Sequence, residues 1–239
     1  PGKGGEWFQL FQIGFGGVPG RPVGDGPDGH SLWPGFTNVP NEFIESYFPL
    51  RIERYETIPD SGGAGLHRGG NGLSVAYRFL CDGDIGIHDE RWLTYPWGVL
   101  GGETGLRSTK RLVRVDGSEQ WLPAKAEGIK VKTGDMLYFN TWGGGGWGDP
   151  FARDPELVQQ DVNRRLVTVD GARRYGVVMA SDGSVDQDAT QTLRAELKAA
   201  AGEPALFNFG GDVEEIRARC EAETHLPAPV KPTFIGASQ

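Results

Sequence analysis

The chain has 239 residues, of which 38% are hydrophobic and 23% are charged, which is enough for one large domain or two small ones. Its formal net charge of -8 argues against nucleic acids and anionic membranes as partners. No stretch approaches the roughly 18 apolar residues of a membrane-spanning helix. Cys81 and Cys220 stand apart without metal-ligand spacing, so we expect a cytoplasmic protein.

The first 29 residues predict a strand followed by a long loop. Residues 6–13 alternate between two mostly apolar faces, as a strand covered on both sides does. Residues 14–29 are rich in glycine and proline, and a loop of this length in a compact domain is usually functional or disordered. Because the chain starts in the middle of a strand pattern, we expect a fragment, or a subunit whose first half lies elsewhere.

A helical turn and a strand come next. Pro40 suits the first helical position, and Glu42 and Glu45 then share one face, which on residues alone favours a solvated helix face. Residues 50–58 alternate as a half-exposed strand does, with a slip at Arg54 that predicts a β-bulge.

The chain is organised around the loop at residues 60–73. Six of these fourteen residues are glycine, and Arg68 is the one certain positive charge. Such a density of glycine is ordered only where the backbone itself is used, for turns with positive φ, for close approach of two backbones, or for amides that face an anion. We therefore predict a compact loop between two strands. Two interpretations stay open, a structural turn cluster and a binding site for a carboxylate or phosphate.

The rest of the chain changes from strands to helices. Further strands are predicted at residues 73–80, 85–88, 108–115, 129–131 and 136–141, with ordered glycine loops at residues 96–105 and 142–150. From Asp154, a good N-cap followed by Pro155, apolar residues recur with a helical period as far as Leu166. Asp186 caps a second helix that ends near Gly202. A weak helical segment at residues 213–220 and a proline-rich end follow, and we expect them to be loosely attached.

These elements predict an α+β fold, with a β-rich module of long glycine-rich loops followed by C-terminal helices. We place the module at residues 1–180 and the helical segment with its loose tail at residues 181–239.

Motifs of familiar enzyme sites are absent from the sequence. It contains no GxxxxGK[ST], HExxH or GxSxG pattern and no Cys/His metal spacing. Residues 88–91 bring His88 next to acidic residues, which is compatible with a metal or acid/base cluster. Neighbours on a strand point to opposite faces, however, so a structural histidine is the favoured interpretation.

Five segments together carry a resemblance to a known family. They are residues 16–29, 38–45, 47–70, 96–102, and 143–155 together with 172–178. The third is long and specific, and the glycine quartet before Gly148-Asp149-Pro150 is also distinctive. The chain resembles the hydantoinase B family, the second subunits of ATP-dependent N-methylhydantoinases and 5-oxoprolinases and the related subunits of acetone and acetophenone carboxylases.

The resemblance implies the C-terminal half of a protein about twice as long. The family's metal-binding His and Asp residues would lie in the missing N-terminal half, so the resemblance implies a divalent metal there, none bound by this chain, and a fragment that is inactive alone. A hydantoinase A-like partner would use ATP to activate a small cyclic amide or a ketone.

The resemblance also nominates site residues. Those expected to act in catalysis are Arg68, Asp25, Asp28, His30 and Glu42. Those expected to bind the substrate or an anion are Asn38, Asp60, Ser61, Gly62, Gly63, Gly65, Gly69 and Gly70. On this hypothesis Arg68 and the backbone amides of residues 62–72 stabilise developing negative charge.

Three functions are compatible with these observations. The first is part of an ATP-dependent cyclic amide hydrolase of the hydantoinase or 5-oxoprolinase type. The second is the same module in an acetone- or acetophenone-type ketone carboxylase. The third is a scaffold without catalytic residues that docks the ATP-using subunit.

Overall fold

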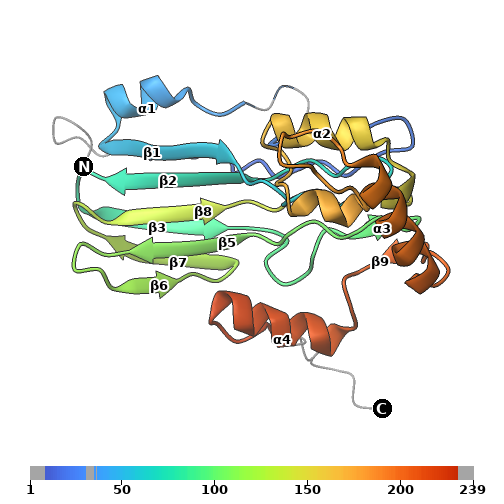
Figure 1. Cartoon of the computed structure of the whole chain (residues 1–239). Helices are drawn as coiled ribbons and strands as arrows, with labels where there is room; N and C mark the ends of the chain where they lie inside the picture. The colour runs from blue at the N-terminus through green and yellow to red at the C-terminus, as the bar shows by residue number, and fades with distance from the viewer. Residues whose placement is uncertain (1–8, 31–34, 36, 231–239) are drawn as a thin grey trace, which may run out of the picture.

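The computed structural model describes residues 9–30, 35 and 37–230, and these form an α+β fold, as the sequence predicts. The strands are β1 (Leu50–Thr57), β2 (Leu73–Phe79), β3 (Gly83–His88), β4 (Gly98–Val99), β5 (Thr109–Val113), β6 (Glu119–Trp121), β7 (Lys125–Val131), β8 (Met136–Asn140) and β9 (Phe207–Asn208). The helices are α1 (Asn41–Tyr47), α2 (Pro155–Asn163), α3 (Gln187–Ala200) and α4 (Val213–Thr224), with the 3-10 turns η1 (Pro150–Ala152) and η2 (Gly171–Tyr175). Figure 1 shows α1 along β1, with α2 and α3 beyond the ends of the strands.

The largest sheet is antiparallel, with the strand order β1-β2-β8-β5-β6. Its edge strand β1 carries the predicted bulge. Ile52 is paired with Tyr77, but Arg54 is paired with Ala76, so that Glu53 is the additional residue. The alternation of apolar and charged residues along β1 therefore changes phase where the sequence indicated.

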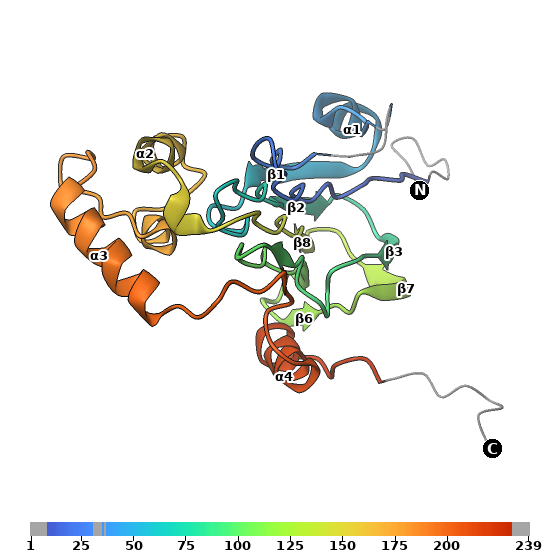
Figure 2. The ribbon, with the colours of Figure 1, turned by 90° about the vertical axis from the view of Figure 1, so that its right-hand side faces the viewer.

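A second, two-stranded sheet of β3 and β7 covers one face of the large sheet. Figure 2 shows the two sheets beside each other. Between them lies a hydrophobic core whose fully buried members include Leu112 and Leu122, at 0% and 1% exposure. The predicted alternating strands thus bury their apolar faces against each other.

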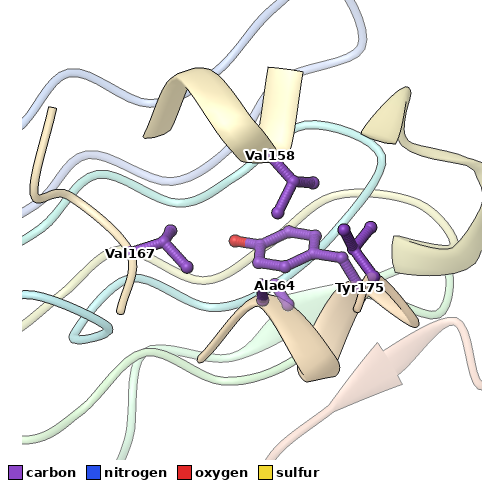
Figure 3. Close-up of a cluster of buried hydrophobic side chains, with 6 residues drawn as sticks. Ala64, Val158, Val167 and Tyr175 are labelled. Atoms are coloured by element: carbon purple, nitrogen blue, oxygen red, sulfur yellow. The ribbon is translucent and has the colours of Figure 1, made fainter. Parts of the chain in front are cut away.

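A separate core joins the helices to the central loop. Tyr175 is 1% exposed and packs with Val158, Val167 and Ala64 (Figure 3). Val158 lies on α2, whose predicted N-cap is confirmed because the Asp154 side chain accepts a hydrogen bond from the backbone N–H of Glu156. Ala64 belongs to the loop at residues 60–73, so the core holds this loop against the helical part of the chain.

The last helix, α4, is held by buried contacts. A capping box at Asp212 starts it, and Ile216 is 8% exposed. Glu223 accepts a hydrogen bond from the Tyr95 hydroxyl at 2.8 Å and forms an ion pair with Arg107 at 2.6 Å. The predicted tail beyond residue 230 lies outside the described residues, and the division at residue 180 stays a prediction.

Several sequence predictions differ from the structure. Residues 9–13 of the predicted first strand are not in a strand. Instead, Asn38 Oδ1 accepts a hydrogen bond from Ile13 N at 2.9 Å, and Asn38 Nδ2 donates one to Ile13 O at 2.7 Å. The side-chain amide of Asn38 thus takes the place of a neighbouring strand. Residues 6–8 lie outside the described residues.

The helix predicted to reach Leu166 ends at Asn163, and Arg165 has φ of +61°. The short strands β4, β6 and β9 were not predicted.

Candidate functional site

Four glycine-rich segments form the centre of the candidate site, and we call residues 16–29, 61–72, 98–105 and 142–148 the glycine bundle. Their backbones are joined by hydrogen bonds between segments. These include Gly17 N to Trp142 O at 2.8 Å, Gly70 N to Val18 O at 2.8 Å, Gly63 N to Gly144 O at 2.8 Å and Gly146 N to Glu103 O at 2.9 Å. Because the partners are far apart in the sequence, the bundle is tertiary structure and not a series of local turns.

Close approach of the backbones explains most of the glycines of this bundle. A Cβ atom on Gly145 would lie 1.7 Å from the carbonyl oxygen of Trp97, and one on Gly17 would lie 1.8 Å from that of Gly70. Neither glycine has a positive φ. Absence of a side chain, and not left-handed backbone freedom, is therefore what these positions use.

The amides predicted to bind an anion face protein groups. Gly62 N donates to the Asn71 Oδ1 atom at 2.9 Å, Gly69 N to Gly63 O at 2.9 Å, and Gly63 and Gly70 donate across the bundle. Gly65 lies with its Cα against the backbone of Trp147, where a Cβ would come within 2.6 Å. An anion at Gly62, Gly63, Gly69 or Gly70 would have to displace an acceptor of the protein itself.

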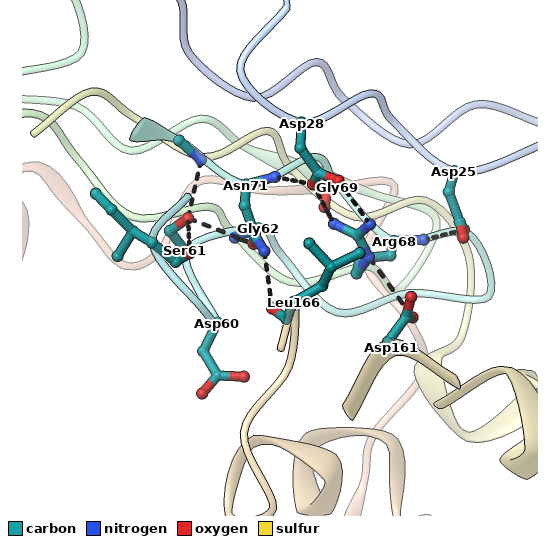
Figure 4. A network of polar contacts seen from close by, with 12 residues as sticks. Asp25, Asp28, Asp60, Ser61, Gly62, Arg68, Gly69, Asn71, Asp161 and Leu166 are labelled. Atoms are coloured by element: carbon teal, nitrogen blue, oxygen red, sulfur yellow. Dashed lines mark hydrogen bonds and ion pairs between the residues drawn. The ribbon is translucent and has the colours of Figure 1, made fainter. Parts of the chain in front are cut away.

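A network of two arginines and three aspartates lies in and beside the bundle, and Figure 4 shows one of its arginines, Arg68, with Asp25, Asp28 and Asp161. Arg68 is 4% exposed and donates from Nη1 to Asp28 Oδ1 at 2.7 Å, while its Nε is 3.6 Å from Asp161 Oδ2. Arg153, 2% exposed, binds both oxygens of Asp25 at 2.7 Å and donates to Asp161 at 2.8 Å. Asp161 is thus shared by both guanidinium groups.

Burial and pairing act in opposite directions on the pKa values of this network. Burial raises the pKa of Asp25, but hydrogen bonds and charge from Arg153, together with the N–H of Arg68, outweigh it, so that this pKa lies below its ordinary value. Burial dominates at Asp161, whose pKa is raised although both arginines lower it. Burial lowers the pKa of Arg68, but Asp28 together with the charge of Asp161 outweighs burial, so that this pKa is raised.

The start of the central loop is held by side-chain hydrogen bonds to the backbone. The hydroxyl of Ser61 donates to Ile58 O at 2.7 Å and accepts from Gly72 N at 2.9 Å. Asp60, which has φ of +62°, accepts from the N–H and the hydroxyl of Thr168 at 3.0 and 2.6 Å. Asp60 and Ser61 therefore close the loop and attach it to the segment before η2.

The structure brings together Arg68, Asp25 and Asp28 of the predicted catalytic residues. His30 and Glu42 are exposed, and Glu42 lies in the first turn of α1, so neither takes part in the ion-pair network. Asn38 of the predicted binding residues is engaged with Ile13. The chemical roles assigned to all these residues stay predictions.

Sequence reasoning missed Arg153, Asp161 and Asn71 as members of this region. Arg153 lies 128 residues from its partner Asp25, and Asp161 is on the buried face of α2. Asn71 Nδ2 donates to Leu166 O at 2.7 Å. Arg153 could have been nominated because it is a charged residue within the distinctive segment at residues 143–155. Nothing in the sequence indicates which carboxylate it binds.

The His88–Arg91 cluster is divided, as strand alternation predicts. His88 is exposed and pairs with Glu127. Asp89 is 6% exposed and pairs with the buried Lys110 and Ser108. Burial lowers the pKa of Lys110, although Asp89 opposes the shift.

No three His, Cys, Asp or Glu side chains gather as a metal-binding group among residues 9–30, 35 and 37–230. The three aspartates of the network are instead bound to arginines. Within the same described part of the chain, no helix is both long and apolar enough to cross a membrane.

Comparison with known proteins identifies related subunits. A family model described as hydantoinase B/oxoprolinase matches residues 1–150. The B subunit of a putative D-/L-hydantoinase from Pseudomonas sp. (strain NS671) is 30% identical over 190 residues, covering 79% of this chain and 32% of that protein. The beta subunit of the caprolactamase from Pseudomonas jessenii is 36% identical over 161 residues, covering 64% and 27%.

Two further matches extend this result. The acetophenone carboxylase delta subunit of Aromatoleum aromaticum (strain EbN1) is 30% identical over 221 residues, covering 78% of this chain and 32% of that protein. The crystal structure of the ATP-dependent caprolactamase from Pseudomonas jessenii superposes with a TM-score of 0.63 at 29% identity, covering 75% of this chain and 32% of that one. The chain spans 27–32% of the length of these hydantoinase, caprolactamase and acetophenone carboxylase subunits.

Proposed function

This chain belongs to the hydantoinase B/oxoprolinase family, and we propose that it is part of the B-type subunit of an ATP-dependent cyclic amide hydrolase. The family comprises subunits of ATP-dependent amidohydrolases and carboxylases. The observation that carries the hydrolase assignment is the match to caprolactamase in both sequence, at 36% identity, and structure, at a TM-score of 0.63.

The proposed chemistry explains a requirement for ATP. Resonance makes an unstrained cyclic amide a poor electrophile. A partner subunit would transfer the γ-phosphoryl group of ATP to the amide oxygen and release ADP. Water then adds to the activated carbon, and the ring C–N bond breaks as the nitrogen takes up a proton. A second water displaces phosphate from the resulting acyl phosphate, which leaves the open-chain amino acid.

Within such a subunit, the contacts favour a positioning role for the described residues. Arg68 is bound to Asp28 and Asp161, and four of the nominated amides are bound to protein acceptors. We therefore propose that the glycine bundle and its ion-pair network hold neighbouring loops in place around the substrate. The aspartates of this network are paired with arginines, so they do not fit the role of metal ligands.

A measurement of ATP hydrolysis tests the proposed function. The full-length protein is purified with its ATP-using partner and supplied with a hydantoin or lactam, with a ketone, or with a ketone plus bicarbonate. We expect the cyclic amide alone to stimulate ATP hydrolysis and to be opened stoichiometrically. Stimulation only by ketone and bicarbonate together contradicts this and supports the carboxylase.

The ketone carboxylase is the second candidate because the alignment with the acetophenone carboxylase delta subunit extends over 221 residues. The scaffold interpretation is favoured by a different observation, the engagement of Arg68 with protein groups. It predicts that substitutions in the bundle reduce the amount of assembled complex but leave turnover per complex unchanged.

A further inference from the structure

Five large apolar side chains gather on one surface beside β4 and β9. Trp97, Leu100, Leu206, Phe207 and Phe209 are each between 44% and 60% exposed, and we call them the β4–β9 patch. The Trp97 ring contacts those of Phe209 and Phe207 at centroid distances of 5.3 and 6.2 Å. Leu100 N donates to Leu206 O at 2.9 Å, so the patch is one continuous surface built from two segments.

The patch borders a hollow of about 620 Å³. Phe207 and Phe209 form part of its wall together with Phe151 and Pro204. Of its three charged side chains, Glu103 pairs with an arginine at 2.8 Å, Asp149 caps η1, and Lys198 is exposed. The wall is therefore largely apolar and suits the apolar side chains of another protein segment better than a polar ligand.

The segment that carries Leu206 and Phe207 of the patch buries little of its own surface. Every residue from 201 to 207 is exposed, and β9 pairs only with β4 among the described strands. Ordering a segment costs conformational entropy that burial normally offsets. A contiguous exposed apolar surface of this kind marks a protein contact site.

We propose that the β4–β9 patch docks the remaining part of a hydantoinase B-type subunit, the residues for which this chain has no counterpart. The chain spans only about a third of its B-type relatives, so most of such a subunit lies outside it. A body that belongs to the same subunit is present in equal amount at high effective concentration. The aromatic, weakly charged character of the patch fits such a permanent interface. The inference rests on the proposed membership of a B-type subunit and not on the reaction proposed for it.

Site-specific photo-cross-linking tests this assignment in the full-length protein with its partner. Phe207→p-benzoylphenylalanine places the probe on the patch, and the same substitution at Val115, 71% exposed in the β5–β6 turn, is the control. We expect adducts at position 207 to map by mass spectrometry to residues of the B-type subunit outside this chain, with a yield several-fold above that of the control.

Other results overturn the proposal. Adducts at position 207 only with the ATP-using subunit or with a second copy of this chain identify a different occupant. A yield equal to that at position 115 leaves the patch exposed. Because cross-linking requires no substrate, a failed ATPase assay with positive cross-links refutes the proposed reaction alone, and the converse refutes the docking site alone.

Discussion

The glycine bundle predicts opposite effects for the same substitution at different positions. In Gly145→Ala the new Cβ atom would lie 1.7 Å from the Trp97 carbonyl oxygen and 3.2 Å from Gly98 N. Overpacking costs about 1–3 kcal/mol where side chains can yield. Here a backbone carbonyl must move by roughly 1 Å or more, so we expect a loss of about 3 kcal/mol or more.

Gly24 provides the matched control. A Cβ there meets nothing within 4 Å, and Gly24 has no positive φ. Gly24→Ala should stabilise the protein by about 0.4–1 kcal/mol, because alanine restricts the unfolded chain.

A third variant tests whether the cost depends only on the distance from the new Cβ atom to its neighbour, or also on whether that neighbour can move. A Cβ on Gly86 would lie 2.2 Å from a carboxylate oxygen of Glu127, but this exposed side chain can rotate away, so Gly86→Ala should be nearly neutral.

Thermal unfolding of variants of this 239-residue chain, followed by calorimetry, measures these differences. For a chain of this size, a loss of 3 kcal/mol lowers Tm by about 6–12 °C. If Gly145→Ala does not accumulate in folded form, its yield relative to Gly24→Ala gives the same ranking. Equal Tm values for Gly145→Ala and Gly24→Ala would refute close backbone approach as the reason for glycine.

Three further predictions concern charges and caps. Arg68→Ala should lower the free energy of unfolding by about 3–5 kcal/mol, because Asp28 and Asp161 lose a buried cation; full stability in denaturant with turnover lost at least tenfold would instead support anion binding. Because the pKa of Asp25 is lowered in the folded state, its carboxylate stabilises the fold at every pH above the ordinary pKa of 3.8. This contribution disappears as the pH falls through the lower pKa of the folded state. Asp25→Asn should therefore be less stable at pH 7 and lose less stability on acidification, and an unchanged dependence of Tm on pH would contradict this. Asp212→Ala removes the capping box of α4 and should cost about 1 kcal/mol, seen as faster amide hydrogen exchange in residues 213–224; unchanged exchange there would show that buried contacts alone hold the helix.

The sequence was sufficient for elements whose signals are local. The slip at Arg54 predicted the bulge in β1, and Asp154 with Pro155 predicted the start of α2, because each depends on neighbouring residues. The strand predicted at residues 6–13 was wrong over its described part, residues 9–13, where the apolar alternation lacks a strand partner and Asn38 occupies the place of one.

The candidate site was predictable only in part, for a similar reason. Arg68 and Asp28 were nominated from the segments that contain them, and their side chains do meet. Arg153 was missed, since its bond to Asp25 joins residues 128 positions apart. The sequence also could not decide between the three uses of glycine, because the distance from a Cα to a remote backbone is a property of the tertiary structure.

The glycine bundle also has a consequence for the order in which the chain folds. Its outer segments join residue 17 to residue 142 and residue 63 to residue 144, so loops of about a hundred residues must close before these bonds form. Residues 16–29 therefore leave the ribosome long before their partners at residues 142–145 are made. We expect protease resistance of this segment in nascent chains to appear only once residue 148 has emerged, and resistance in shorter chains would contradict this. Until then residues 16–29 lack their bonds to residues 142–145, and the bundle is completed only by the last of its four segments.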